Sequence, residues 1–339
     1  MNSTGKRIMK SFFRHKLGMI GLVILILMYL MVLMADFISP YNYATTSSGY
    51  VNAPPTKIHF FDESGKFRGP FIYALKKSRD PVTYMLSFTE DKSRIVPVKF
   101  FVKGDEYSFW GIWKTNIHLF GVEEPSSSAM LLLFGADRFG RDLFSRTMAG
   151  SKVSMTVGLI GTFISVVIGA IIGALSGFYG GWIDILLQRF IELLRSFPRI
   201  PLWLAFATIL PPNWPSTWVY MGIVAVLSLI GWMGIARVVR GMVLSLREKD
   251  FVLAAKISGV SGYKIVIKHL IPNTLSYLIV VTTLSIPGMI LGESSISFLG
   301  LGIKEPMTSW GLLLKQAQSL SALQTTPWLV IPGIFIMLA

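Results

Sequence analysis

Long apolar runs alternate with shorter polar segments along most of the chain. The first run, Leu17–Ala35, is longer than a signal-peptide core and has no small-residue cleavage site after it, which predicts a retained transmembrane helix. A helix needs about 20 mostly apolar residues to cross a bilayer. The pattern therefore predicts an all-α polytopic membrane protein with about six transmembrane helices, the later ones at Val153–Phe178, 181–210, 217–235, 275–291 and Pro327–Ala339. The last run is too short to cross, so we expect a truncated sixth helix there.

A polar stretch at 39–133 interrupts this pattern after the first run. It mixes charges of both signs with aromatic residues, and runs such as Ile95–Val102 are bounded by Gly, Asp and Pro, which predicts short strands. Because one span precedes it, this stretch should be a small extracellular β-rich insertion. Its Phe109, Trp110 and Trp113 either form the core of that lobe or help to receive a partner protein.

Composition and charge narrow the class further. Only 15% of the residues are charged, against about a quarter in soluble domains, which favours a membrane protein. The net charge of +14 does not indicate nucleic-acid binding, because the basic residues flank apolar runs, where lipid headgroups and the positive-inside bias explain them. The absence of cysteine excludes disulfides, thiol catalysis and Cys-based metal sites. Basic residues without acids precede the first run and predict a cytoplasmic N-terminus: Lys6, Arg7, Lys10, Arg14 and Lys16.

The third predicted helix carries charges that cannot all face lipid. Its uncharged part, 200–210, covers only about half of the hydrocarbon thickness. Arg189 and Arg195 each lie three residues from Glu192, so we expect ion pairs within the helix in preference to a substrate-binding charge. The charged residues of its first half are Asp184, Arg189, Glu192, Arg195 and Arg199.

One face of the second predicted span is made of small residues. Gly161, Gly169, Gly173 and Gly177 share a helical register, and such a face lets another helix approach closely. The approaching helix could belong to the same chain or to a second subunit.

The basic segment at 240–272 lies between the fourth and fifth spans, and both parity and charge place it in the cytoplasm. Its pattern predicts a short amphipathic helix from Asp250, a reversal at Gly259 and a second helix that ends before Pro272. Such an elbow has the shape needed to fit a groove on a partner and transmit its motion. The alternative is an ordinary charged loop.

This segment resembles the coupling motif of ABC importer permeases, Glu-Ala-Ala-x3-Gly-x9-Ile-x-Leu-Pro. Gly259 and Pro272 fall at the matching spacing, whereas Leu253 replaces the glutamate of the motif. The resemblance implies that the elbow docks on an ATPase subunit and lacks the polar contact of that glutamate. The implied coupling loop consists of Asp250, Leu253, Ala254, Ala255, Lys256, Gly259, His269 and Pro272.

Two further segments resemble the C-type subunit of the dipeptide, oligopeptide and nickel permeases. Phe134–Arg146 is similar to the family's Gly-Thr-Asp-x-x-Gly-Arg-Asp-x-x-Ser-Arg, and Ser297–Ile303 with the Trp310 region is similar to its external loop after the fifth helix. The resemblance covers the chain except 39–133 and implies the fold of a type I ABC importer permease. The matching external positions are Asp137, Gly140, Arg141, Asp142, Ser145, Arg146, Ser297, Phe298, Gly300, Gly302 and Trp310.

The resemblance also implies a function. The chain would form half of the translocation pathway for peptides or a similar small solute in the plasma or inner membrane, by alternating access. Implied partners are a homologous second permease subunit, two ABC ATPase subunits, an extracellular solute-binding protein and membrane lipid. Since the chain has no Gly-x4-Gly-Lys-Ser/Thr loop, ATP and Mg should bind to the separate ATPase subunits. We expect no catalytic, cofactor or metal site in this chain.

Two other classes of function remain as alternatives. An intramembrane enzyme is disfavoured, because the four histidines form no His-Glu-x-x-His pair and have no evident serine partner. A stand-alone secondary carrier or channel is the better rival, since the third helix and the Pro287–Gly288 break could serve ion coupling, although no internal repeat is evident. The expected domains are 1–38 (cytoplasmic N-terminus and first helix), 39–133 (insertion) and 134–339 (permease domain).

Overall fold

The computed structural model describes residues 16–79, 81, 86–122 and 129–339 and divides into two compact units. Unit 1 consists of Met1–Val153 and Thr308–Ala339, and unit 2 consists of Ser154–Met307. The prediction of a cytoplasmic N-terminus rests largely on Lys6, Arg7, Lys10 and Arg14, which lie outside the described residues.

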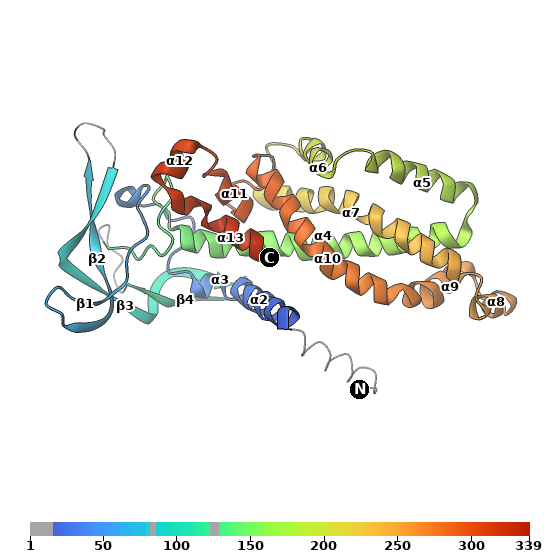
Figure 1. The fold of residues 1–339 in the computed structure, drawn as a ribbon, viewed down its shortest axis with the longest axis horizontal. Coiled ribbons are helices and arrows are strands. Elements are labelled where there is room, and N and C mark those ends of the chain that lie inside the picture. The colour runs from blue at the N-terminus through green and yellow to red at the C-terminus, as the bar shows by residue number, and fades with distance from the viewer. Residues whose placement is uncertain (1–15, 80, 82–85, 123–128) are drawn as a thin grey trace. The chain divides into compact units, whose positions relative to one another are not determined.

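The strands of unit 1 form one antiparallel sheet in the order β1-β2-β3-β4, and all lie within the polar stretch 39–133 (Figure 1). Tight turns join β1 to β2 and β3 to β4, with Gly65 and Gly111 at positive φ. The strand bounds are β1 His59–Phe61, β2 Phe67–Arg79, β3 Leu86–Phe109 and β4 Trp113–Val122.

A small apolar core forms on the sheet of unit 1. Ile72, Val98, Val122 and Leu131 are buried together there. Trp113 is 57% exposed and stacks on Phe109, so this aromatic pair lies outside that core. The alternative in which these aromatic residues are simply the core of the lobe is therefore not what the structure shows.

Helices make up the rest of unit 1. The apolar helix α2 (Lys16–Leu33) leads into α3 (Ala35–Ile38) and the turn η1 (Ser48–Tyr50). The C-terminal helices pack on one another through Leu313, Ala317 and Leu329. Their bounds are α11 Trp310–Lys315, α12 Leu320–Thr325, η3 Pro327–Val330 and α13 Ile331–Leu338.

Unit 2 is a bundle of long helices (Figure 1). The helix α4 (Leu143–Tyr179) begins in unit 1 and continues into unit 2. The others are α5 Gly181–Arg195, α6 Arg199–Ala207, α7 Ser216–Leu246, α8 Asp250–Ile257, α9 Gly262–Ile265, η2 Val266–Leu270 and α10 Ile271–Phe298.

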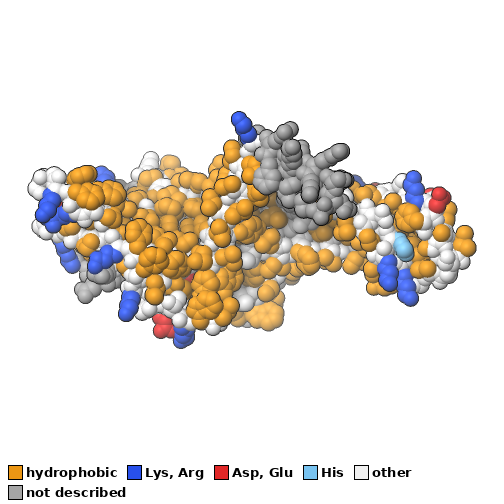
Figure 2. All heavy atoms as spheres, turned by 90° about the horizontal axis from the view of Figure 1, so that it is seen from below, with side chains coloured by type: hydrophobic (Ala, Val, Ile, Leu, Met, Phe, Trp, Pro, Cys, Tyr) orange, Lys and Arg blue, Asp and Glu red, His pale blue; other side chains and the backbone are white. Residues whose placement is uncertain are grey.

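Three continuous helical stretches of the described chain are long and apolar enough to cross a membrane: Leu143–Tyr179, Ser216–Leu246 and Gly262–Phe298. Two shorter apolar helices cover Gly18–Leu33 and Pro327–Leu338. Hydrophobic side chains cover much of the molecular surface in Figure 2, as expected for helices that face lipid or other helices. A mostly helical membrane fold is thus confirmed, and the number of six spans stays a prediction.

Several helices differ from their predicted form. The second span was predicted from Val153, but α4 already begins at Leu143, directly after a tight loop, and runs on without a break. The predicted break at Pro287–Gly288 is also wrong, because α10 continues through Pro287, which removes only one backbone donor. The third predicted helix is divided instead into α5 and α6, and Pro198 lies directly before α6.

The second helix of the elbow does not end before Pro272, which is where the sequence pattern placed its end. It passes through a π-helical turn, Val266–Leu270, directly into α10. Pro272 then occupies the first turn of α10, and a wider turn before a proline accommodates its missing N–H.

Candidate functional site: the helical elbow

The elbow begins with α8, a helix of eight residues whose charges suit its dipole. Asp250 lies in its first turn and Lys256 in its last turn. Gly259, at φ +73°, ends the helix. The N–H of Gly259 donates to the Lys256 carbonyl at 3.0 Å and the N–H of Val260 donates to the Ala255 carbonyl at 3.0 Å, which is the Schellman pattern. The predicted reversal is therefore built from glycine at the one position that needs it.

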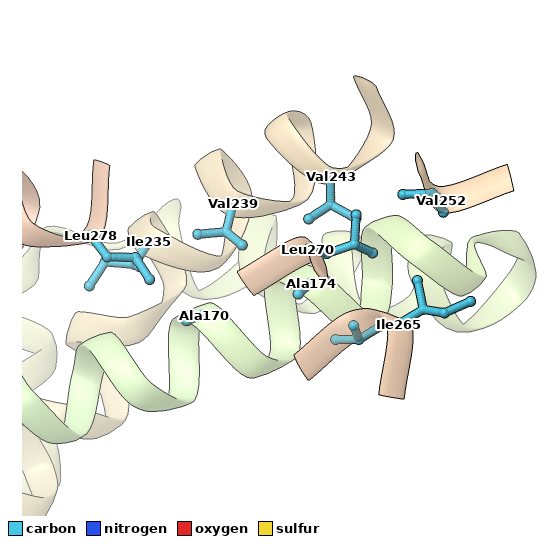
Figure 3. Packing of buried hydrophobic residues seen from close by; sticks show 10 residues of the cluster. Ala170, Ala174, Ile235, Val239, Val243, Val252, Ile265, Leu270 and Leu278 are labelled. Atoms are coloured by element: carbon cyan, nitrogen blue, oxygen red, sulfur yellow. The ribbon is translucent and has the colours of Figure 1, made fainter. Parts of the chain in front are cut away.

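The inner face of the elbow is anchored in the core of unit 2 (Figure 3). Val252 of α8 and Ile265 of α9 are fully buried and belong to one apolar cluster with Val243 of α7 and Ala174 of α4. Displacement of α8 would therefore be felt directly by α4, α7 and the start of α10, since packed side chains transmit strain.

A second contact joins the elbow to the end of α4. A Cβ on Gly262 would lie 2.9 Å from the Tyr179 hydroxyl and 3.0 Å from the Phe178 ring. The ammonium of Lys256 lies 5.2 Å from the centre of the Phe178 ring, within cation–π range. The elbow thus contacts α4 from both of its helices.

The outer face of α8 is apolar and uncovered. Phe251 and Leu253 are each 40% exposed, and Ile257 is 88% exposed. Leu253, which replaces the glutamate of the motif, therefore adds apolar surface where the motif has a charge. Of the other predicted coupling residues, Ala255 and His269 are half-buried, and Asp250, Ala254, Lys256, Gly259 and Pro272 are exposed.

An ion pair fastens α5 to α7 within unit 2. The guanidinium of Arg240 donates from two nitrogens to the two carboxylate oxygens of Asp184, both at 2.5 Å, and Ser176 of α4 also donates to Asp184. Arg247, at the end of α7, donates to the Gly177 carbonyl of α4 at 3.1 Å. Three helices are therefore tied together by polar contacts. Sequence reasoning noticed Asp184 but missed Arg240, because the two lie 56 positions apart.

The glycine face of α4 packs on α7 of the same chain. A Cβ on Gly169 would lie 2.8 Å from the Trp232 carbonyl oxygen, and one on Gly173 would overlap the Ala236 carbonyl oxygen. Gly177 approaches the Arg240 carbonyl in the same way, whereas Gly161 has more room. The sequence left open whether this face packs on the same chain or on a second subunit, and in the structure it packs on α7 of the same chain.

The segment 134–146 folds around the buried carboxylate of Asp137. Its Oδ1 accepts the N–H groups of Phe139 and Arg141, and its Oδ2 accepts the Arg141 Nε–H at 2.8 Å. Arg146 Nε lies 3.7 Å from the same carboxylate. Gly140, at φ +72°, packs so closely on Ser47 that a Cβ would overlap the Ser47 carbonyl oxygen. These residues of the external motif thus hold the loop before α4.

Asp142 and Ser145 begin α4. The Asp142 carboxylate accepts the backbone N–H of Ser145 at 2.8 Å and its hydroxyl at 2.6 Å, an N-cap arrangement. Burial raises the pKa of Asp142 to about 6. Trp310 is fully buried and its indole N–H donates to the Thr147 carbonyl at 3.0 Å.

The Ser297–Ile303 segment closes the end of α10 in unit 2. The Ser297 hydroxyl donates to the buried carboxylate of Glu293 at 2.7 Å, and Ser154 of α4 donates to the same carboxylate at 2.9 Å. Gly300 is at positive φ, and Gly302 packs against Ser297. Phe298 ends the helix. Sequence reasoning missed Glu293, although a lone acid in an apolar run flanked by serines was a usable signal.

Within the described residues, no cluster of three or more His, Asp or Glu side chains could hold a metal ion. The elbow instead combines an inner face that is buried in the core of unit 2 with an outer face that is apolar and exposed.

Residues 141–339 match the family described as "Binding-protein-dependent transport system inner membrane component". Residues 3–55 match "N-terminal TM domain of oligopeptide transport permease C".

Three relatives illustrate the similarity. "Oligopeptide transport system permease protein OppC" of Haemophilus influenzae is 45% identical over 206 residues, 60% of this chain and 64% of that protein. "Dipeptide transport system permease protein DppC" of Bacillus subtilis is 36% identical over 207 residues, 60% of this chain and 62% of that protein. "Oligopeptide transport system permease protein OppC" of Bacillus subtilis is 28% identical over 335 residues, 98% of this chain and 83% of that protein. The matches to the first two relatives thus span less than two thirds of their length.

Proposed function

Because the chain belongs to the family of binding-protein-dependent transport system inner membrane components, we propose that it is a permease subunit of an ABC importer for peptides. It forms half of the translocation pathway and works by alternating access. The printed names of its relatives, which are oligopeptide and dipeptide permeases, support the substrate class.

The observation that carries this proposal is the elbow. A helix that presents Phe251, Leu253 and Ile257 outward while Val252 is locked into the bundle is suited to receive force from a partner. Two ATPase subunits, which bind ATP and Mg, would dock on this elbow and on its counterpart in a homologous second permease. An extracellular solute-binding protein would deliver the peptide.

The proposed topology follows from the order of the helices. The elbow is cytoplasmic, the N-terminus is cytoplasmic, and the four-stranded sheet lies outside the cell. The segment from α8 to η2 carries Lys256, Lys264 and Lys268 against the single acid Asp250, which is consistent with a cytoplasmic location under the positive-inside bias. With α2 and α13 counted, the family fold would have about six spans.

The experiment is uptake of a labelled oligopeptide into proteoliposomes that contain this chain, its partner permease, the ATPases and the binding protein. We expect uptake that requires ATP and every component. Uptake driven by a proton or sodium gradient in vesicles holding this chain alone would establish the rival, a stand-alone carrier.

A further inference from the structure

A groove of about 310 Å³ opens within unit 2 between α6, α7 and α10. Its volume lies at the lower end of the roughly 300–1,000 Å³ typical of small-ligand pockets, so it suits one end of a peptide rather than a folded chain. A Cβ on Gly234 or Gly288 would meet no atom within 4 Å, so these glycines leave the groove open. The argument uses Arg199, Trp203, Gly234, Tyr277, Ser285 and Gly288 of its lining.

The groove contains an uncompensated positive charge. In α5, Arg189 pairs with Glu192 at 2.8 Å. In the part of the chain that the structure describes, Arg195 and Arg199 form no ion pair, contrary to the predicted pairing of Arg195 with Glu192. Both arginines also line a smaller adjoining groove with Ile230. Since a cation beside apolar helices is costly without a counter-charge, this place favours an anionic ligand.

Trp203 lines the same groove beside Arg199. Trp203 is only 7% exposed, and its indole N–H has no hydrogen-bond partner among the described residues. Because this nitrogen is itself buried, Trp203 offers the groove its apolar ring, and Arg199 is the donor. Arg199 and Trp203 lie one helical turn apart on α6, so the charge and the ring lie on the same side of that helix.

We propose that this groove receives the C-terminal carboxylate of a peptide in transit, with Arg199 as its ion-pair partner. Guanidinium and carboxylate match as a bidentate pair. The rings of Trp203 and Tyr277, together with Ser285, contact the last residue of the peptide. This inference rests on the proposed function and adds to it the chemical group that the permease recognises.

The test uses the complete reconstituted importer and two probes, an alanine pentapeptide with a free C-terminal carboxylate and the same peptide as its amide. For Arg199→Gln, uptake of the free acid should fall at least about tenfold, the loss expected for a hydrogen bond to a charged group. Uptake of the amide should stay near its wild-type value. Arg189→Gln is the matched control, because Arg189 is an exposed arginine like Arg199 but lines neither groove, and it should leave both rates unchanged.

A second variant tests the groove itself. Gly234→Leu places a side chain in open space, so the protein should unfold at its wild-type temperature while uptake of both probes falls. An unchanged ratio of acid to amide uptake in Arg199→Gln would overturn the proposal. So would an Arg199→Gln defect that is present in vesicles with anionic lipid and disappears in vesicles of zwitterionic phosphatidylcholine, since the anion would then be an anionic lipid headgroup. Absence of ATP-driven uptake of either probe by the wild-type importer would instead refute the proposed function.

Discussion

Asp137 accounts for the residue pattern of the external motif. Its carboxylate accepts backbone N–H groups from both sides of a turn and pairs with Arg141, so the polar residues of the motif serve the loop rather than a ligand. Glu293 has a similar role at the end of α10, where Ser154 and Ser297 donate to it. Removing a buried carboxylate of this kind is costly, because the groups that donate to it are left buried without an acceptor.

Gly140 offers a test at the residue scale. Gly140→Ala places a methyl group at positive φ and against the Ser47 carbonyl, so we expect a clear fall in unfolding temperature. Gly65→Ala is the control, because Gly65 is also at positive φ but a methyl group there would meet no atom within 4 Å. The control should lose only about 1–2 kcal/mol of folding stability, which is the cost of the left-handed backbone conformation for a residue with a Cβ. Thermal unfolding of the purified chain in detergent measures both, and equal losses would contradict the close packing at Ser47.

At the scale of elements, hydropathy located the helices better than it located their ends. The run 217–235 predicted a span, but α7 continues to Leu246 because Arg240 is paired with Asp184 and does not have to stop the helix. In the same way, α4 begins at Leu143, ten residues before its apolar run, where Asp142 caps it. Caps and distant ion pairs determine helix ends, and a single sequence does not reveal which residues will meet.

The glycine face of α4 gives an element-scale prediction. Gly173→Ala forces α4 away from the Ala236 backbone and should destabilise the protein by about 1–3 kcal/mol. Gly161→Ala is matched to it, since its Cβ would lie 3.7 Å from the nearest atom and the change should fall within about 0.5 kcal/mol. Chemical unfolding in detergent compares them. Similar losses in both variants would mean that α4 and α7 do not pack as described.

The reversal after α8 gives a second prediction at the scale of elements. Gly259→Pro cannot adopt a φ of +73° and removes the N–H that donates to Lys256, so ATP hydrolysis should continue while ATP-driven uptake is lost. Gly259→Asn keeps the left-handed conformation at little cost and should retain uptake. Parallel measurements of hydrolysis and uptake in the reconstituted importer decide this. Normal coupling in Gly259→Pro would remove the role given to the elbow.

At the scale of the whole molecule, the sequence motifs located the elbow better than they revealed how the interior is organised. Fixed spacing from Ala254 to Pro272 indicated the elbow, and its Schellman turn is local and thus readable. The groove at Arg199 and Trp203 is built from three helices far apart in sequence. Its recognition needed the tertiary structure, because the sequence alone does not show which residues of α7 and α10 lie beside Arg199.

The most direct test of the account is a photo-crosslinking residue placed at Ile257, the most exposed apolar position of α8, in the assembled importer. We predict capture of an ATP-hydrolysing subunit at Ile257, and none at the exposed lobe residue Phe67 in a matched experiment. Capture of lipid alone at Ile257, or of the ATPase at Phe67, would contradict the claim that the elbow receives the force of ATP hydrolysis.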